Sequence, residues 1–145
     1  MRIRSILLAS VLTLTYVLGR AEATAHEVDV KDLRILHPYT HEPAGEAPYR
    51  LAIYMTVKNT GAVPDRLVAV SSPLAKGAAI VGPRSSDKGT MELPGGAETV
   101  LGPESAYVEL TGVTSEIAGY EYFPVWLQFE VAGRVEAEIF VEERR

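Results

Sequence analysis

From residue 28 onwards the chain alternates between hydrophobic and polar residues with a period of two. This period is typical of β-strands that bury one face. The alternation covers residues 28–35, 49–57, 125–131 and 135–141, and shorter apolar runs cover 67–70, 91–93, 98–101 and 107–110. Gly, Pro or Asn separates these runs about every 8–12 residues, a spacing that indicates a sandwich or barrel. We therefore predict one all-β domain.

Three stretches do not follow this alternation. Residues 37–48 are expected to be irregular, because Pro38, Pro43 and Pro48 each lack the N–H group that a strand ladder uses. Residues 74–81 are rich in Ala and fit either a strand or a helix, and residues 82–89 are predicted to form a loop.

The first 25 residues resemble a secretory signal peptide. Arg2 and Arg4 precede a short apolar run that ends near Leu18, and small residues follow it. Ala-x-Ala patterns allow cleavage after either Ala23 or Ala25. The run is shorter than the roughly 20 residues that span a bilayer, so we expect residues 1–25 to be removed and 26–145 to form the exported domain.

Composition limits the possible chemistry. The chain has no Cys, which excludes disulfides, thiolate metal ligands and Cys catalysis. Its formal charge is −5, and removal of residues 1–25 with three Arg and one Glu would make it −7. An acidic domain argues against nucleic acid or an anionic membrane surface as partner. No Gly-x-Ser-x-Gly, phosphate-binding Gly loop or His-Glu-x-x-His occurs, so we expect a non-enzyme.

Five segments in order resemble the periplasmic copper chaperone family called PCuAC. They are residues 33–39, 54–61, 64–73, 91–96 and 127–133, and together they span most of the predicted domain. The resemblance implies a Greek-key β-sandwich or barrel of the cupredoxin-like kind, with immunoglobulin-like topology. It also implies a periplasmic protein that binds copper and delivers it during cytochrome oxidase assembly.

The resemblance further implies a Cu(I) site made of His and Met, because thioether and imidazole suit this soft ion. At the corresponding positions this sequence has Val81, Pro83, Tyr107 and Glu109, and Thr111 follows where the family often has another Met. The family site therefore cannot be transferred to these residues, and whether copper is bound stays open.

Three histidines remain as nitrogen donors. Cleavage after Ala25 would place His26 at the N-terminus, where its α-amine and imidazole suit Cu(II). The alternative is a solvated terminal residue. His37 and His41 are expected to share a ligand only in a helix, which Pro38 and Pro43 disfavour.

Other candidate side chains have ordinary structural interpretations. Met55 and Met91 are expected in the core. Tyr107 and Glu109 should share one strand face, as a polar patch or as ordinary solvent-facing residues. An aromatic group precedes the last hairpin and is expected to be partly buried, with an exposed recognition surface as the alternative: Tyr120, Tyr122, Phe123 and Trp126.

Two functional hypotheses follow. The first is a copper-chaperone-family protein with a degenerate site, any metal being held near His26, and an oxidase subunit or assembly factor as partner. The second is an envelope interaction domain that kept the fold without copper and binds another protein through Tyr107, Glu109 and the 82–90 loop. Neither involves stable membrane insertion after cleavage.

Overall fold

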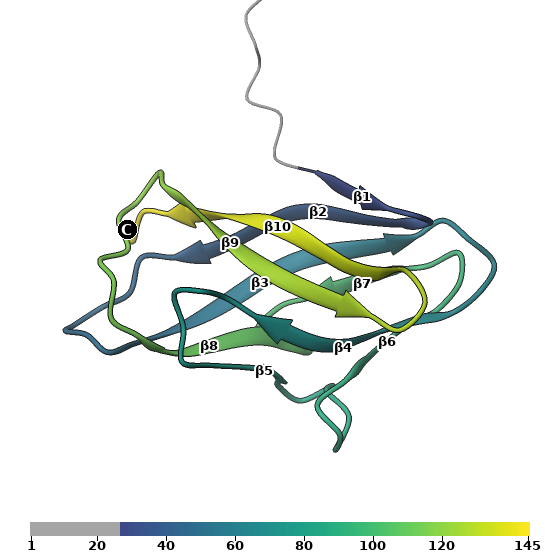
Figure 1. The fold of residues 1–145 in the computed structure, drawn as a ribbon, viewed down its shortest axis with the longest axis horizontal. Helices are drawn as coiled ribbons and strands as arrows, with labels where there is room; N and C mark the ends of the chain where they lie inside the picture. Colours follow the sequence, from purple (N-terminus) through teal and green to yellow (C-terminus); the bar gives the residue numbers. More distant parts are fainter. Residues whose placement is uncertain (1–26) are drawn as a thin grey trace, which may run out of the picture.

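The computed structural model describes residues 27–145, in which the chain forms ten β-strands and no helix (Figure 1). The predicted all-β class is confirmed. No helix in this part of the chain is long and apolar enough to cross a membrane. The strands are β1 (Val28–Val30), β2 (Leu33–His41), β3 (Tyr49–Asn59), β4 (Asp65–Ser71), β5 (Gly77–Val81), β6 (Met91–Leu93), β7 (Glu98–Leu101), β8 (Tyr107–Val113), β9 (Tyr122–Phe129) and β10 (Gly133–Glu142).

The strands form one strongly curved sheet in the order β5-β8-β3-β2-β10-β9-β4-β6, with β1 added to β2 and β7 added to β3. The described pairs are antiparallel except for β10 and β2, which run parallel. The end of β10 consequently lies beside the end of β2 (Figure 1). Curvature turns one face of every long strand inward, giving the nearly closed, cupredoxin-like barrel that the pattern and resemblance predicted.

The core follows the alternation in the sequence. On β3 the residues Leu51, Ile53, Met55 and Val57 are buried, as predicted from their spacing of two. Met91 is also buried, which confirms both methionines as core residues. On the last hairpin the buried side chains are Phe123, Val125, Leu127 and Phe129 on β9 and Ala137, Ile139 and Val141 on β10. Val131 is half-exposed because it lies in the turn and not on a strand.

The predicted continuous strand over residues 28–35 is wrong. Lys31 and Asp32 form a tight turn between β1 and β2, and Lys31 has a φ of 48°. The carbonyl of Asp32 accepts hydrogen bonds from both the N–H and the hydroxyl of Thr60, which fixes the turn against the β3–β4 loop. Two short strands of opposite direction can both alternate, so the periodicity did not reveal the turn.

The predicted irregular stretch from residue 37 to 48 begins too early. Strand β2 continues to His41 through a bulge between Leu36 and Tyr39, where His37 has a φ of 47°. Pro38 is tolerated there because the bulge interrupts the ladder at the position where its missing N–H would be needed. Residues 77–81, left open between helix and strand, form strand β5.

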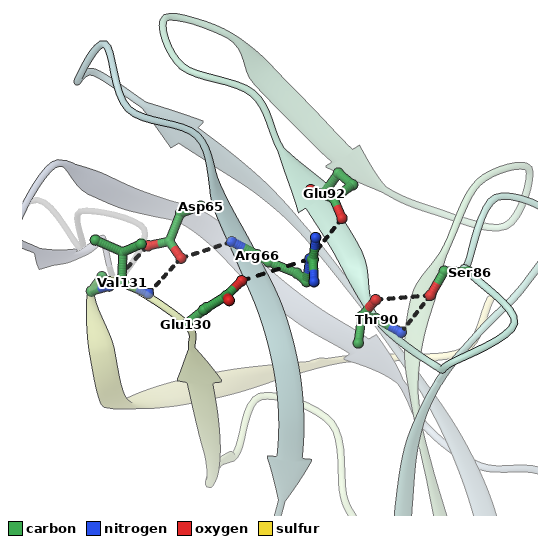
Figure 2. Close-up of polar contacts among 8 residues, drawn as sticks. Asp65, Arg66, Ser86, Thr90, Glu92, Glu130 and Val131 are labelled. Atoms are coloured by element: carbon green, nitrogen blue, oxygen red, sulfur yellow. Dashed lines mark hydrogen bonds and ion pairs between the residues drawn. The ribbon is translucent and has the colours of Figure 1, made fainter.

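A buried carboxylate joins β4 to the β9–β10 turn. Asp65 is 6% exposed and accepts hydrogen bonds from the backbone N–H groups of Arg66, Val131 and Ala132 at 2.7, 2.8 and 2.9 Å (Figure 2). The same region carries an exposed ion pair, in which Arg66 Nε lies 2.6 Å from Glu92. Asp65 therefore supplies acceptors to the N–H groups of Val131 and Ala132 in this turn.

The predicted loop between β5 and β6 is confirmed and is closed by its own hydrogen bonds. The hydroxyls of Ser86 and Thr90 are 2.8 Å apart, and the Thr90 N–H donates to Ser86 Oγ at 3.1 Å (Figure 2). These bonds close residues 86–90, the second half of the loop, into a tight turn before β6.

Candidate functional site

Two of the four positions at which the resemblance implies copper ligands lie side by side. Val81 on β5 is the direct cross-strand partner of Tyr107 on β8. Pro83 follows β5 by two residues, and Glu109 pairs with Ala79 on β5 and with Ala52 on β3. The register thus gathers residues that are far apart in sequence at one end of the β5–β8 pair.

The side chains at this place are engaged in other contacts. The ring of Tyr107 packs edge-on against Tyr54, with centroids 5.8 Å apart. Glu109 forms an ion pair with Arg50 at 2.8 Å and is 18% exposed at its side chain. The expectation that Tyr107 and Glu109 share a strand face is confirmed by their common half-buried positions on β8.

An aromatic row extends from Tyr107 across the outer face of β3 to β2. Its members are Tyr107, Tyr54, Tyr39, His37 and His41. Tyr54 lies 5.5 Å from Tyr39 and 6.4 Å from His41 between ring centroids. Burial raises the pKa of Tyr54, and its neighbours Tyr107 and Tyr39 raise it further. The Tyr54 phenol therefore stays protonated and neutral at physiological pH.

His37 and His41 approach the same carboxylate, contrary to the expectation that only a helix could bring them to one ligand. His37 Nε2 lies 3.7 Å from Glu142 Oε1, and His41 Nδ1 lies 3.5 Å from Glu142 Oε2. Residues four apart on a strand point to the same side. Both imidazoles flank Tyr39, at centroid distances of 5.2 and 5.6 Å.

Glu142 could not have been connected with these histidines from the sequence. It lies about a hundred residues away and reaches them because β10 pairs with β2 in parallel, with Glu142 opposite His41. A parallel pair between the first long strand and the last has no local sequence signal. His26, the proposed N-terminal copper ligand, lies outside the described residues.

The aromatic group before the last hairpin divides into separate parts. Phe123 is buried, whereas Tyr120 is 70% exposed and Tyr122 is 45% exposed. Both tyrosines pack on Phe140, at centroid distances of 6.3 and 5.1 Å. Trp126 instead lies under the guanidinium of Arg134, 4.1 Å from its ring.

A surface hollow of about 690 Å³ lies beside the end of β10. It is lined by His41, Tyr120, Phe140, Glu142 and the last three residues, 143–145. Hydrogen bonds fix its border, because Tyr120 donates to Glu143 and Arg144 Nε donates to the carbonyl of Glu42. His41 and Glu142 thus line an accessible surface hollow.

Within residues 27–145, no three His, Cys, Asp or Glu side chains already form a metal-binding group. Val and Pro supply no donor atom, and a neutral phenol or an ion-paired carboxylate is a poor ligand for Cu(I). The place implied by the resemblance is therefore chemically unsuited to that ion. The described nitrogen donors lie instead on β2.

Comparison with known proteins identifies the family of this chain. The LpqE-like family, described as a lipoprotein family, matches residues 28–141, which indicates an extracytoplasmic protein. No curated protein matches the chain.

Solved structures give the same result. The apo PCuAC domain from PmoF1 is 29% identical with a TM-score of 0.75, covering 82% of this chain and 100% of that one. The copper-bound PCuAC domain from PmoF2 is 28% identical with a TM-score of 0.74, covering 82% and 99%. Cu(I)-bound DR1885 from Deinococcus radiodurans, 20% identical with a TM-score of 0.54 and covering 83% of each chain, shares the fold. The predicted relationship is confirmed: the chain belongs to the LpqE-like family and is a divergent relative of the PCuAC copper chaperone domains.

Proposed function

We propose that this protein is an extracytoplasmic copper-handling protein of the PCuAC type in which the family's Cu(I) site is degenerate. The observation that supports this most directly is the pairing of Val81 with Tyr107 across β5 and β8. Two positions at which the resemblance implies ligands for one ion are neighbours here, yet neither holds a soft donor. We propose no catalytic role, because PCuAC domains are chaperone-type domains.

The remaining donors favour the oxidised ion. Imidazole nitrogen and carboxylate oxygen suit Cu(II), whereas no thioether, the group that favours Cu(I), lies on the surface of residues 27–145, since Met55 and Met91 are buried. We propose that residues 1–25 are a signal peptide and that 26–145 form the periplasmic domain. Cleavage after Ala25 then makes His26 the N-terminal residue, whose free α-amine and imidazole can both bind Cu(II). The partner would be an oxidase subunit or assembly factor.

A competitive titration with Cu(I) and Cu(II) tests this proposal on the exported, processed protein. Intact mass first establishes whether the mature chain begins at Thr24 or His26. We expect one-to-one Cu(II) binding and no tight Cu(I) binding. Tight Cu(I) binding by the natural protein would contradict a degenerate site.

Restoring the lost ligands tests their placement separately. The quadruple variant Val81→His, Pro83→Met, Tyr107→His and Glu109→Met should bind Cu(I), because it returns two imidazoles to the paired positions 81 and 107 and two thioethers to positions 83 and 109. The matched control is Val81→Ala with Tyr107→Phe, which changes the same strands without adding donors. If the quadruple variant is folded but does not bind Cu(I), the ligand positions are wrongly assigned.

The second candidate is an interaction domain without metal. It is favoured by a hollow of about 930 Å³ between the 84–90 loop and residues 98–105, beside the exposed side chain of Val100. Val100 is 60% exposed and forms an apolar surface on a protein that is otherwise acidic. If neither copper ion binds the processed protein, this candidate replaces the first.

A further inference from the structure

The two histidines of β2 and the last residue of β10 form a donor cluster on the outer face of the sheet. Defined by its residues, the cluster is His37, His41 and Glu142. The parallel β2–β10 register places Glu142 opposite His41, and the bulge before Tyr39 redirects His37 towards the same carboxylate. Backbone pairing, and not chance side-chain contact, thus holds the three residues together.

The distances within the cluster are too long for good hydrogen bonds. The two N···O separations are 3.7 and 3.5 Å, whereas an N–H···O bond is about 2.7–3.2 Å. They are close to the separation of about 3.4 Å that two ligands have on a tetrahedral metal with bonds near 2.0–2.1 Å. The spacing therefore fits donors around a cation better than donors bonded to each other.

The donors do not converge on a single point as they stand, because each imidazole approaches a different oxygen of Glu142. Convergence requires these side chains to rotate. The side chains of His37, His41 and Glu142 are 56%, 51% and 36% exposed, so solvent and not packing surrounds their outer atoms. This exposure leaves room for the rotation.

The electrostatic surroundings favour a cation. Within residues 27–145, Glu142 has no Lys or Arg within ion-pair distance and faces the two imidazoles alone. The nearest basic residue along the chain, Arg144, donates through its Nε to the carbonyl of Glu42. A carboxylate without a fixed cationic partner gains most from binding a metal ion.

We propose that His37, His41 and Glu142 bind a divalent transition-metal ion, Cu²⁺ in preference to Zn²⁺. Two nitrogens and a carboxylate leave further coordination positions to water or to a partner's ligand, as in an open site. The order of the two ions follows the usual affinity series. The inference rests on the proposed copper-handling role for the choice of copper, whereas the site itself is argued from the described residues.

The test uses the exported, processed protein and titrates Cu²⁺ and Zn²⁺ against a competing chelator. The variants are His37→Asn, His41→Gln and Glu142→Gln. Asn is chosen at position 37 because it tolerates the positive φ of 47° that an Ala would strain. Circular dichroism and Trp126 fluorescence establish that each variant is folded. Electron paramagnetic resonance of the Cu²⁺ form counts the nitrogen ligands.

The three substitutions are measured in a His26→Ala background, which removes the proposed N-terminal copper ligand. In this background we expect one-to-one binding that weakens at least tenfold in each of the three variants, since losing a ligand should cost no less than losing an outer-shell partner. The matched control in the same background is Glu138→Gln, a partly exposed carboxylate on the same strand, which should leave this binding unchanged. Nitrogen coupling should fall by one ligand in each His variant.

The outcomes separate this inference from the proposed function. If the His26→Ala protein binds no Cu²⁺, while the three cluster substitutions made alone leave Cu²⁺ binding intact, the N-terminal copper site stands and the cluster is refuted. If Zn²⁺ binds at the cluster while Cu²⁺ does not, the cluster is confirmed as a metal site and the proposed role in copper handling is refuted. If folded natural protein binds neither ion, both are overturned.

Discussion

Replacing Asp65 by Ala would remove three acceptor contacts from the junction of β4 with the β9–β10 turn. Two of these contacts join residues more than sixty positions apart, to the N–H groups of Val131 and Ala132. The third, to Arg66, is local. The perturbation therefore tests whether one buried carboxylate holds the last hairpin against the rest of the sheet (Figure 2).

The magnitude depends on which N–H groups can find water afterwards. A hydrogen bond to a charged group contributes about 1.5–3 kcal/mol, and a buried unsatisfied N–H costs about 1–3 kcal/mol. Val131 is 53% exposed and its N–H can be hydrated, whereas Ala132 is 8% exposed. We therefore expect Asp65→Ala to cost about 3 kcal/mol and not the sum of three full bonds. Asp65→Asn keeps one acceptor oxygen and should cost about half as much.

Urea denaturation followed by the fluorescence of Trp126 measures this effect. Trp126 lies on β9, three residues before the strand ends, and is the protein's one Trp. The midpoint should fall while the slope stays unchanged, because the same surface is exposed on unfolding. In a thermal scan the loss corresponds to a Tm lowered by roughly 10 °C for a domain of this size.

Glu130→Gln is the matched control, since Glu130 lies beside the same turn but is 58% exposed and pairs with Arg66 at 3.8 Å. An exposed ion pair of this kind contributes about 0–1 kcal/mol. If Asp65→Ala were no more destabilising than Glu130→Gln, the carboxylate would not hold the turn, and the argument from buried acceptors would be refuted.

Four further substitutions test other parts of the fold by the same denaturation assay. Gly82→Ala should lower stability by more than about 2 kcal/mol, because φ is 109° and a Cβ would collide with the backbone oxygen of Ser105. Gly45→Ala, where φ is 82° but the surrounding space is open, should cost about 1 kcal/mol. Equal losses in the two variants would refute the collision. Thr40→Val should cost about 1 kcal/mol through the bond its buried hydroxyl donates to β3 at 2.8 Å, and a neutral result would contradict that bond. Arg50→Ala should change stability by at most about 1 kcal/mol although its ion pair is short, because Arg50 is 71% exposed; a larger loss would show that the pair is structurally important.

The all-β class and most strands could be predicted because each long strand buries alternate residues. Leu51 to Val57 and Val125 to Phe129 show this directly. The alternation could not locate the Lys31–Asp32 turn, since turns that use positive φ at a non-Gly residue leave little trace in hydrophobicity. It also failed at Pro38, where a bulge removes the conflict between proline and strand.

The site was less accessible to sequence reasoning than the fold. The register that pairs Val81 with Tyr107 agrees with the positions inferred from the resemblance. The prediction that His37 and His41 reach one ligand only in a helix is wrong. The segment is a strand that contains Pro38, and both histidines approach Glu142. The deciding residue was Glu142, and its position depends on a parallel strand pair formed between the two ends of the domain.

The two ends of the aromatic row on the outer face differ in whether their polar atoms are available to bind a metal. At the β5–β8 end, Tyr107 packs on Tyr54 and Glu109 is paired with Arg50, so the polar atoms are already used within the protein. At the β2–β10 end, two imidazoles and a carboxylate stand exposed and separated by more than a hydrogen bond. The aromatic row connects the two ends through Tyr54, which lies between Tyr107 and His41. A metal at the cluster would therefore lie on the face that also carries Val81 and Tyr107, where the resemblance implies the family's ligands, but displaced across β8 and β3 and held by harder donors. If so, a partner able to receive Cu(I) from thioethers need not be the partner that approaches this surface.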